Sequence, residues 1–272
     1  MKDIALQTAR SAKGRTLNVL REYIQNELLG TLQKKGVHER LYFVGGTALR
    51  FLYQIPRFSE DLDFSAGPDW RAADFPPDME TVAAEIRLGG YELTLHLQSD
   101  RTVQRAAFRF PGLLFELGLS SRRDQKLTIS IEVDVRPPEG WSGERTIVNI
   151  YRPILIQHYD LRSLFTTKIA TILTRDYIKG RDYYDLFWYR SRWKDLAPML
   201  SLLKNAIDQK PERITPFEPC EWVSILRRHI SGLDWKDVLR DVQPFIERTD
   251  DLLVFTQENV LRLLEEPATQ SL

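Results

Sequence analysis

The sequence predicts a mixed α/β (α+β) fold, in which a core that contains a sheet is followed by a helical C-terminal domain. Three stretches between residues 91 and 135 alternate apolar and polar residues with a period of two, as strands do. From Asp160 onward the apolar residues recur at spacings of three and four, as on one face of a helix. The expected domains are therefore residues 1–157, a core with an N-terminal helix, and residues 158–272, a helical domain.

Length and composition exclude several classes of protein. The 272 residues suffice for one large or two small domains. Lys and Arg number 38, as do Asp and Glu, and this balance argues against a polycationic DNA-binding protein. One cysteine excludes an internal disulfide, and with only four histidines a zinc cluster is not expected. Because no apolar run of about 18 residues occurs and the N-terminus lacks a signal segment, we expect a cytoplasmic protein without a membrane span.

The first elements follow from apolar spacing and from turn residues. A leucine-rich stripe predicts one helix over residues 4–35, and the apolar run 41–44 predicts a buried strand. A short helix is expected to begin at about Thr47, and a second strand is expected over 61–66. Two further segments complete this part, a proline-containing loop over 67–77 and a helix over 78–88.

The remaining elements divide into strands and helices at about residue 157. Strands are expected over 91–97, 103–110 and 126–135, followed by a loop over 136–145 and one more strand interrupted at Pro153. The helical part has a break expected at 210–219. Its expected helices are 160–176, 181–191, 195–209, 219–230, 235–248 and 252–266.

A glycine turn between the first strand and the next helix is the first candidate site. Gly45 and Gly46 allow a tight turn and close approach of a ligand to the backbone. The helix that begins at about Thr47 directs its free N–H groups toward this turn, which suits a phosphate group. A Gly-Gly turn by itself is a weak signal, because such turns are common.

Two carboxylates about fifteen residues later form the second candidate site. Asp61 and Asp63 occupy alternate positions of the expected strand and therefore project to the same side. Two adjacent carboxylates repel each other unless a cation lies between them. Mg²⁺, held by carboxylates and by substrate phosphates, is the usual solution.

Further charged residues could complete a site for phosphoryl transfer. In the strand 126–135, Glu132 and Asp134 face the same way, and either could supply a third carboxylate. Their spacing alone does not choose between them. Lys168 lies on one expected helix, and Asp182 and Asp185, three residues apart, share a face of the next.

Together these motifs resemble the AbiEii/AbiGii-type nucleotidyltransferase toxins, which include the MenT-type toxins. The resemblance rests on GGTAL, on PRFSEDLDF, on a later lysine helix and on RDYYDL, in this order. It implies a polymerase-β-like nucleotidyltransferase core with a mixed sheet. Gly45, Gly46 and Thr47 match the nucleotide-phosphate turn.

The resemblance also implies roles for the other motif residues. Arg57 and Ser59 match positions that contact triphosphate, and Asp61 and Asp63 match metal ligands. Because aspartate is the usual third ligand in the superfamily, Asp134 is favoured slightly over Glu132. Lys168 and Asp182 match the later lysine and aspartate, Asp185 being a second candidate, in a helical domain that would complete the active-site cleft.

The implied activity is Mg²⁺-dependent transfer of a nucleotidyl group from an NTP to an acceptor hydroxyl. The resemblance implies that the acceptor is RNA, a tRNA 3′ end, and that the protein is the toxin of a toxin–antitoxin or phage-defence system with a separately encoded antitoxin. Alternatives are transfer to a small molecule or partner protein, and a catalytically silent nucleotide-binding module. Basic residues on the expected strands and loops would suit RNA, or would form a solvated face; these are Arg101, Arg105, Arg109, Arg122, Arg123 and Lys126.

Overall fold

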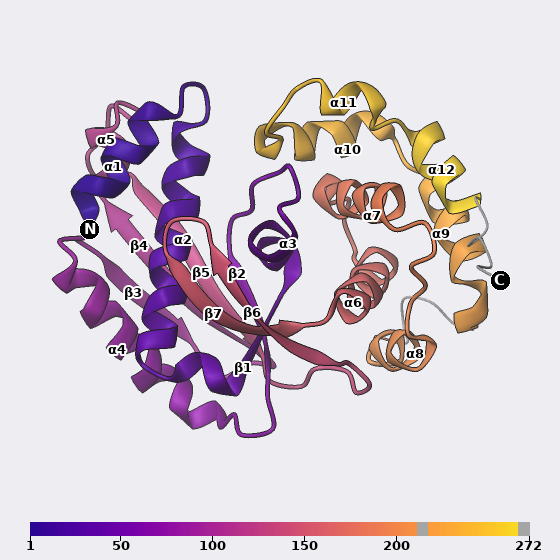
Figure 1. Ribbon diagram of the computed structural model, residues 1–272, viewed down its shortest axis with the longest axis horizontal. Helices are drawn as coiled ribbons and strands as arrows, with labels where there is room; N and C mark the ends of the chain where they lie inside the picture. Colours follow the sequence, from indigo (N-terminus) through magenta and orange to yellow (C-terminus); the bar gives the residue numbers. More distant parts are fainter. Residues whose placement is uncertain (211–216, 266–272) are drawn as a thin grey trace. The chain divides into compact units, whose positions relative to one another are not determined.

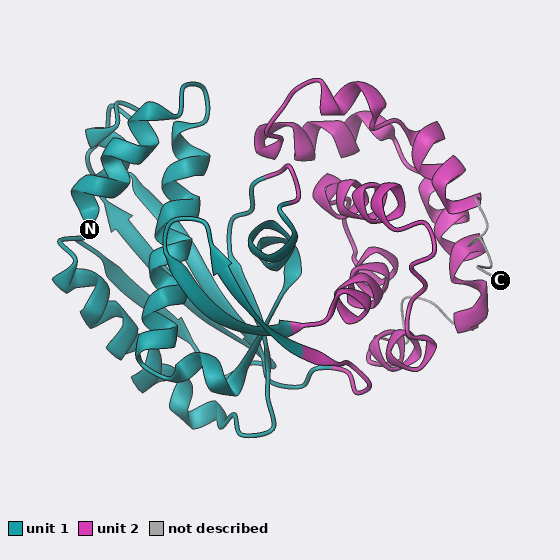
Figure 2. Cartoon of the chain, viewed as in Figure 1, with its two compact units in different colours: residues 1–54, 58–137, 144–158 teal, residues 55–57, 138–143, 159–272 magenta. Residues whose placement is uncertain are grey.

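The computed structural model describes residues 1–210 and 217–265, which form two compact units. Unit 1 comprises residues 1–54, 58–137 and 144–158, and unit 2 comprises residues 55–57, 138–143 and 159–272 (Figure 2). The segment 55–57 therefore belongs to the helical unit although the chain on either side of it belongs to the sheet unit.

Unit 1 is built on a mixed sheet with the strand order β3-β4-β5-β2-β1-β7-β6 (Figure 1). Strand β2 runs parallel to β5 and β1 runs parallel to β7, whereas β1–β2, β3–β4 and β4–β5 are antiparallel. This arrangement confirms the expected mixed α/β class. The strands are β1 (Leu41–Val44), β2 (Leu62–Ala66), β3 (Thr94–Gln98), β4 (Val103–Pro111), β5 (Lys126–Asp134), β6 (Gly143–Asn149) and β7 (Pro153–Tyr159).

One face of this sheet is apolar and is covered by helices. Ile129, Ile131 and Val133 alternate along β5 and are fully buried, each such side chain contributing about 1.5–3 kcal/mol to folding. Helix α2 (Thr16–Lys34) contacts β5, and α4 (Phe75–Leu88) contacts β3, β4 and α2, so both helices lie on the same face. The other face of β5 and β2 is therefore left for the polar residues of the period-two pattern.

Three sequence predictions in unit 1 were wrong in detail. The expected helix 4–35 is two helices, α1 (Lys2–Ser11) and α2, separated by a turn in which Gly14 has a φ of +78°. Helix α4 begins at Phe75, so Pro76 and Pro77 lie in its first turn, where a missing N–H costs nothing. Pro153 is the first residue of β7 and does not interrupt a strand, so this region holds two strands. The short helix α5 (Leu113–Glu116) was not expected.

Unit 2 contains helices that pack through aromatic side chains. Tyr184 and Trp235 both pack on the buried ring of Phe255, with centroid distances of 5.2 and 5.0 Å. Gly180 allows the closest approach, because a Cβ there would lie 1.9 Å from the carbonyl oxygen of Val238. The helices are α6 (Leu161–Thr174), α7 (Gly180–Arg192), α8 (Leu200–Asp208), α9 (Trp222–Ser231), α10 (Trp235–Val242), α11 (Asp251–Val254) and α12 (Gln257–Glu265).

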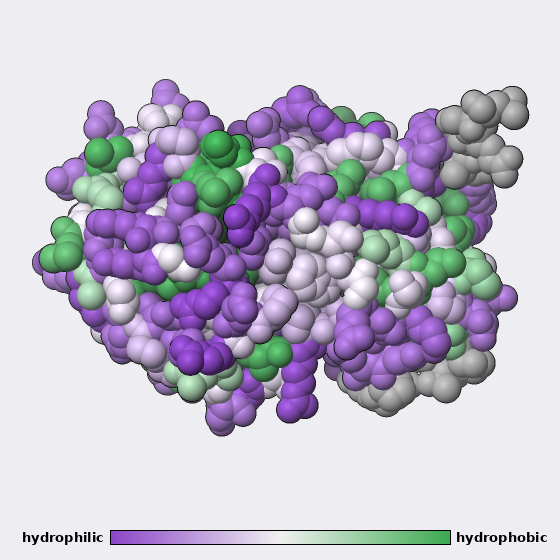
Figure 3. Space-filling model, turned by 60° about the horizontal axis from the view of Figure 1, so that its bottom comes forward, coloured by the Kyte–Doolittle hydropathy of each residue, from purple (hydrophilic) through white to green (hydrophobic). Residues whose placement is uncertain are grey.

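The expected helices of unit 2 are present, with altered bounds. The segment 235–248 ends as a helix at Val242, and 252–266 is divided between α11 and α12, residue 266 lying outside the described residues. The expected break at 210–219 lies largely outside them too. In the face shown in Figure 3, apolar side chains gather in separate patches among hydrophilic ones. Among the described residues, no helix has the length and apolar content that crossing a membrane requires.

Candidate active site

The glycine turn directly follows β1, and its first glycine, Gly45, is also the first residue of α3 (Gly45–Tyr53). Gly45 has a φ of +77°, a left-handed conformation that glycine adopts without strain. A Cβ at this position would lie 2.3 Å from Asp63 Oδ2 and 3.0 Å from Asp63 Cγ. The absence of a side chain at Gly45 therefore makes room for the Asp63 carboxylate beside the N-terminus of α3.

Asp61, directly before β2, is held by contacts from α3 and from β5. The Thr47 hydroxyl, which is fully buried, donates to the carbonyl oxygen of Asp61. Ser130 N, on β5, donates to Asp61 Oδ1 at 2.9 Å. Asp63 alternates with the buried Leu62 and Phe64 of β2 and therefore lies on the face opposite the core, whereas Asp61 directly precedes the strand.

The register of β2 and β5 locates the two candidates for a third carboxylate. Glu132 pairs with Asp63, whereas Asp134 lies one step further along and pairs with Ser65. The Glu132 side chain forms an ion pair with Arg105 at 3.2 Å and is 30% exposed. Asp134 Oδ1 instead accepts a hydrogen bond from Arg136 N at 2.9 Å, in the turn after the strand. Glu132 is therefore the candidate in register with Asp63.

These residues have the chemistry to hold a divalent metal together with a nucleotide. Within residues 1–210 and 217–265, no three or more His, Cys, Asp or Glu side chains are grouped so that they could hold a metal ion by themselves. Mg²⁺ usually keeps several waters and takes phosphate oxygens in addition to one or two carboxylates. The hard oxygen ligands of Asp61 and Asp63, the latter beside the glycine turn, fit such an ion.

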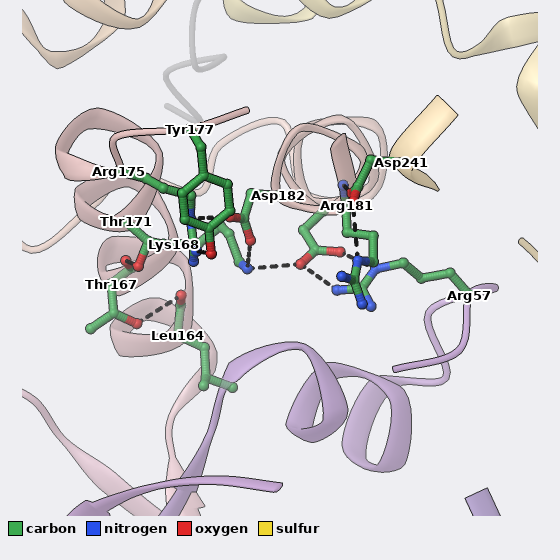
Figure 4. A network of polar contacts seen from close by, with 11 residues as sticks. Arg57, Leu164, Thr167, Lys168, Thr171, Arg175, Tyr177, Arg181, Asp182 and Asp241 are labelled. Atoms are coloured by element: carbon green, nitrogen blue, oxygen red, sulfur yellow. Dashed lines mark hydrogen bonds and ion pairs between the residues drawn. The ribbon is translucent and has the colours of Figure 1, made fainter. Parts of the chain in front are cut away.

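In unit 2, Lys168 on α6 lies in a buried cluster with both candidate aspartates of α7 (Figure 4). Its Nζ atom is 2.6 Å from Asp182 Oδ1 and 2.9 Å from Asp185 Oδ2. Asp182 is 4% exposed and Asp185 is fully buried. Both aspartates therefore contact the lysine. The sequence left open whether Asp182 or Asp185 is the partner of Lys168, and in the structure both are.

Two arginines complete this cluster. Arg57 Nε and Nη2 each donate to an oxygen of Asp185 at 2.6 Å, a bidentate pair in which the arginine is 2% exposed. Arg175 Nε lies 3.1 Å from Asp182 Oδ2 as an ion pair without the alignment of a hydrogen bond. Asp182 and Asp185 thus have three cationic partners, Lys168, Arg57 and Arg175.

The protonation of the cluster follows from its charges. Burial raises the pKa of Asp182, but the nearby Lys168 and Arg175 outweigh it and lower the pKa to about 2. Burial alone would lower the pKa of Lys168, whereas Asp182 and Asp185 raise it above its ordinary value. Lys168 is therefore a permanently charged ammonium group at neutral pH.

Sequence reasoning missed two residues that shape these sites. Arg175 lies seven residues after Lys168, a helical spacing that places both on one face and that could have indicated it. Gln25 on α2 donates through Nε2 to the carbonyl oxygens of Ser59 and Glu60, at 3.2 and 2.9 Å, and is 1% exposed. It fixes the segment that leads into Asp61, and no local signal marks it.

Several solved structures share this fold with the chain. The chain is similar to MenT4, a nucleotidyltransferase toxin from Mycobacterium tuberculosis, with a TM-score of 0.52 and 20% identity over 98% of this chain and 99% of that one. It is similar to JHP933 from Helicobacter pylori, with a TM-score of 0.52 and 17% identity over 91% of this chain and 88% of that one. At these identities the likeness shows a shared fold. No curated protein matches the chain by sequence.

A mixed sheet with a glycine turn beside paired aspartates, in a fold shared with nucleotidyltransferases, defines the class: this chain is a nucleotidyltransferase. It belongs to the AbiEii family of nucleotidyl transferase toxins of type IV toxin–antitoxin systems, whose profile matches residues 27–255. The resemblance given by the motifs is thereby confirmed. Membership implies a nucleoside triphosphate substrate and an antitoxin partner.

Proposed function

We propose that this toxin transfers a nucleotidyl group from an NTP to the 3′ hydroxyl of an RNA, a tRNA, with Mg²⁺ as the metal. The observation that carries the proposal is the position of the Asp63 carboxylate against Gly45, with Asp61 two residues earlier and bonded to the backbone of β5. A nucleotide whose phosphates occupy the glycine turn would meet both carboxylates. Bound Mg²⁺ would supply charge stabilisation for the phosphates and for the attacking oxygen.

The reaction then follows from ordinary phosphoryl-transfer chemistry. The acceptor oxygen attacks the α-phosphorus and forms a new O–P bond, while the bond from the α-phosphorus to the bridging α–β oxygen breaks. Pyrophosphate leaves with the electron pair of the broken bond, and the hydroxyl proton passes to Glu132 or Asp134. In such a reaction most of the rate enhancement comes from residues that position the reactants and that stabilise the charge of the transition state.

For unit 2 we propose a role in nucleotide binding. Lys168 and Arg175 are two of the three cationic partners of Asp182 and Asp185, and both side chains retain some exposure, 10% and 23%. Partly exposed cationic groups attract a polyphosphate. Arg57, bidentate to Asp185, is then a positioning residue that keeps the aspartates in place for Lys168.

The test is incubation with each α-³²P-labelled NTP, Mg²⁺ and total tRNA, followed by separation of RNA, protein and small molecules. Label in tRNA that is lost with EDTA and with Asp63→Asn supports the proposal. Label only in protein or in a small molecule would replace the RNA acceptor by one of those alternatives. Full activity in EDTA, or in a folded Asp63→Asn protein, would refute the metal assignment.

A further inference from the structure

The sheet face that carries Asp63 continues across β5, β4 and β3 as a polar surface. In the register of these strands, Glu132 lies beside Asp63, Arg105 beside Glu132, and Gln98 beside Arg105. The next row on this face is Ser130, Ala107 and His96, of which Ser130 and Ala107 are buried, and the row after it is Thr128, Arg109 and Thr94. These rows face away from the helices, because the alternate residues face α4.

Burial along β4 shows which side is open. Phe108 and Phe110 are fully buried, and the Gln104 side chain donates to the carbonyl oxygen of Ala72, just before α4. On the opposite side, the Arg105 side chain is 46% exposed and Arg109 is partly exposed. The edge strand β3 exposes Thr94, His96 and Gln98 on this side. The open face is thus defined by Thr94, His96, Gln98, Arg105, Arg109 and Thr128.

The charges of the open face are unequal. Arg105 pairs with Glu132 and donates to Ser130 Oγ, and these contacts fix its guanidinium beside the Glu132 carboxylate. The side chain of Arg109 forms no hydrogen bond or ion pair with any residue in the described part of the chain, whereas its backbone pairs within the sheet. The two arginines are four residues apart, about 13 Å at roughly 3.3 Å per residue. The protein as a whole has no net charge, but Arg105 and Arg109 lie along β4 on this face, two strands away from β2, which carries Asp63.

We infer that the open face binds the sugar–phosphate backbone of a single-stranded RNA end, with Arg109 and Arg105 as its phosphate contacts; this rests on the proposed RNA acceptor. Arginine is suited to phosphate, and the neutral polar side chains beside it suit phosphate and sugar oxygens. The open face has no Phe, Tyr or Trp that could serve as the apolar anchor of a protein partner. An extended anionic strand laid along it would bring its end to Asp63.

The test measures binding of fluorescein-labelled tRNA by anisotropy at several salt concentrations, without NTP. Arg109→Ala should weaken RNA binding roughly five- to tenfold, with a larger loss in Arg109→Glu, and should reduce the slope of log K against log[salt] by about 0.7–1. The matched control is Arg71→Ala, an 80% exposed arginine that precedes α4 on the helix-covered side. It should bind RNA as the wild type does.

The outcomes separate this inference from the proposed function. Equal RNA affinity of wild type, Arg109→Ala, Arg109→Glu and Arg71→Ala overturns the inference. So does a rise of the KM for NTP in Arg109→Ala with unchanged RNA affinity, because the face would then serve the nucleotide. The proposed function is judged instead by transfer of label to tRNA in the wild type, which the binding measurement does not use.

Discussion

Replacing Gly45 with alanine should abolish transfer while the protein remains folded. The backbone at Gly45 is left-handed, with a φ of +77°, and the added methyl group would lie 2.3 Å from Asp63 Oδ2. A real Cβ does not approach an oxygen so closely, so the Asp63 carboxylate must move. Displacement of a reacting group by about 1 Å can cost on the order of a hundredfold in rate.

The stability cost of this substitution can be separated from its effect on the site. A left-handed conformation costs an alanine about 1–2 kcal/mol relative to glycine. Gly36 offers a matched control, because its φ is +71° and nothing lies within 4 Å of an added Cβ. Gly36→Ala should therefore lose a similar free energy of unfolding, measured by urea denaturation, and should keep its transfer rate.

The transfer rates of the two alanine variants decide whether the contact between Gly45 and Asp63 matters for catalysis. Loss of transfer of at least a hundredfold in Gly45→Ala, with near wild-type transfer in Gly36→Ala, is the expected result. If Gly45→Ala transfers label as fast as the wild type, the contact between this turn and Asp63 is irrelevant to catalysis. Equal losses of transfer in both variants would attribute the effect to stability alone.

Three further predictions concern the charged residues. Lys168→Met should lower the free energy of unfolding by about 1.5–3 kcal/mol, because Asp182 and Asp185 lose a charged hydrogen-bond donor but each keeps an arginine; a urea-denaturation loss under 1 kcal/mol would contradict this. Because the pKa of Asp182 is lowered to about 2, its ionisation should contribute about 2 kcal/mol to the free energy of unfolding. This contribution is complete above pH about 4 and is lost as the pH falls toward 2. In Asp182→Asn the free energy of unfolding should therefore fall less between about pH 4 and pH 2 than in the wild type, and an equal fall would contradict the prediction. Glu132→Gln should reduce transfer at least tenfold more than Asp134→Asn, because Glu132 is in register with Asp63; the reverse order of rates would assign the role to Asp134.

Much of the sheet could be predicted because its signals are local. Strands β1, β2 and β5 begin and end within one residue of their predicted bounds, since each is a short apolar or alternating run that ends at a turn. Prolines misled the prediction of one helix and of one strand. Pro76 lies in a first helical turn and Pro153 opens a strand, two positions where the missing N–H has no cost.

The two parts of the candidate site differ in how far the sequence reveals them. The period of two of a strand predicts that Asp61 and Asp63 share a side, and this prediction uses spacing alone; in the structure Asp63 lies in β2 and Asp61 directly precedes it. The pairing of Arg57 with Asp185 joins residues 128 positions apart, and that of Lys168 with Asp182 joins two helices. Such contacts depend on how segments pack, and no periodicity within one segment contains that information.

The composition of the Lys168 cluster indicates why such a costly arrangement is retained. Burying ions costs several kcal/mol each, and a well-packed apolar replacement is often as stable, so the pairs with Asp182 and Asp185 are weak evidence for a role in stability. A purely structural cluster would also be expected to balance its charges. In this one Asp182 and Asp185 have three cationic partners, of which Arg175 and Lys168 are partly exposed. The positive charge of Lys168 and Arg175 supports our proposal that these two residues bind the polyphosphate of the nucleotide substrate.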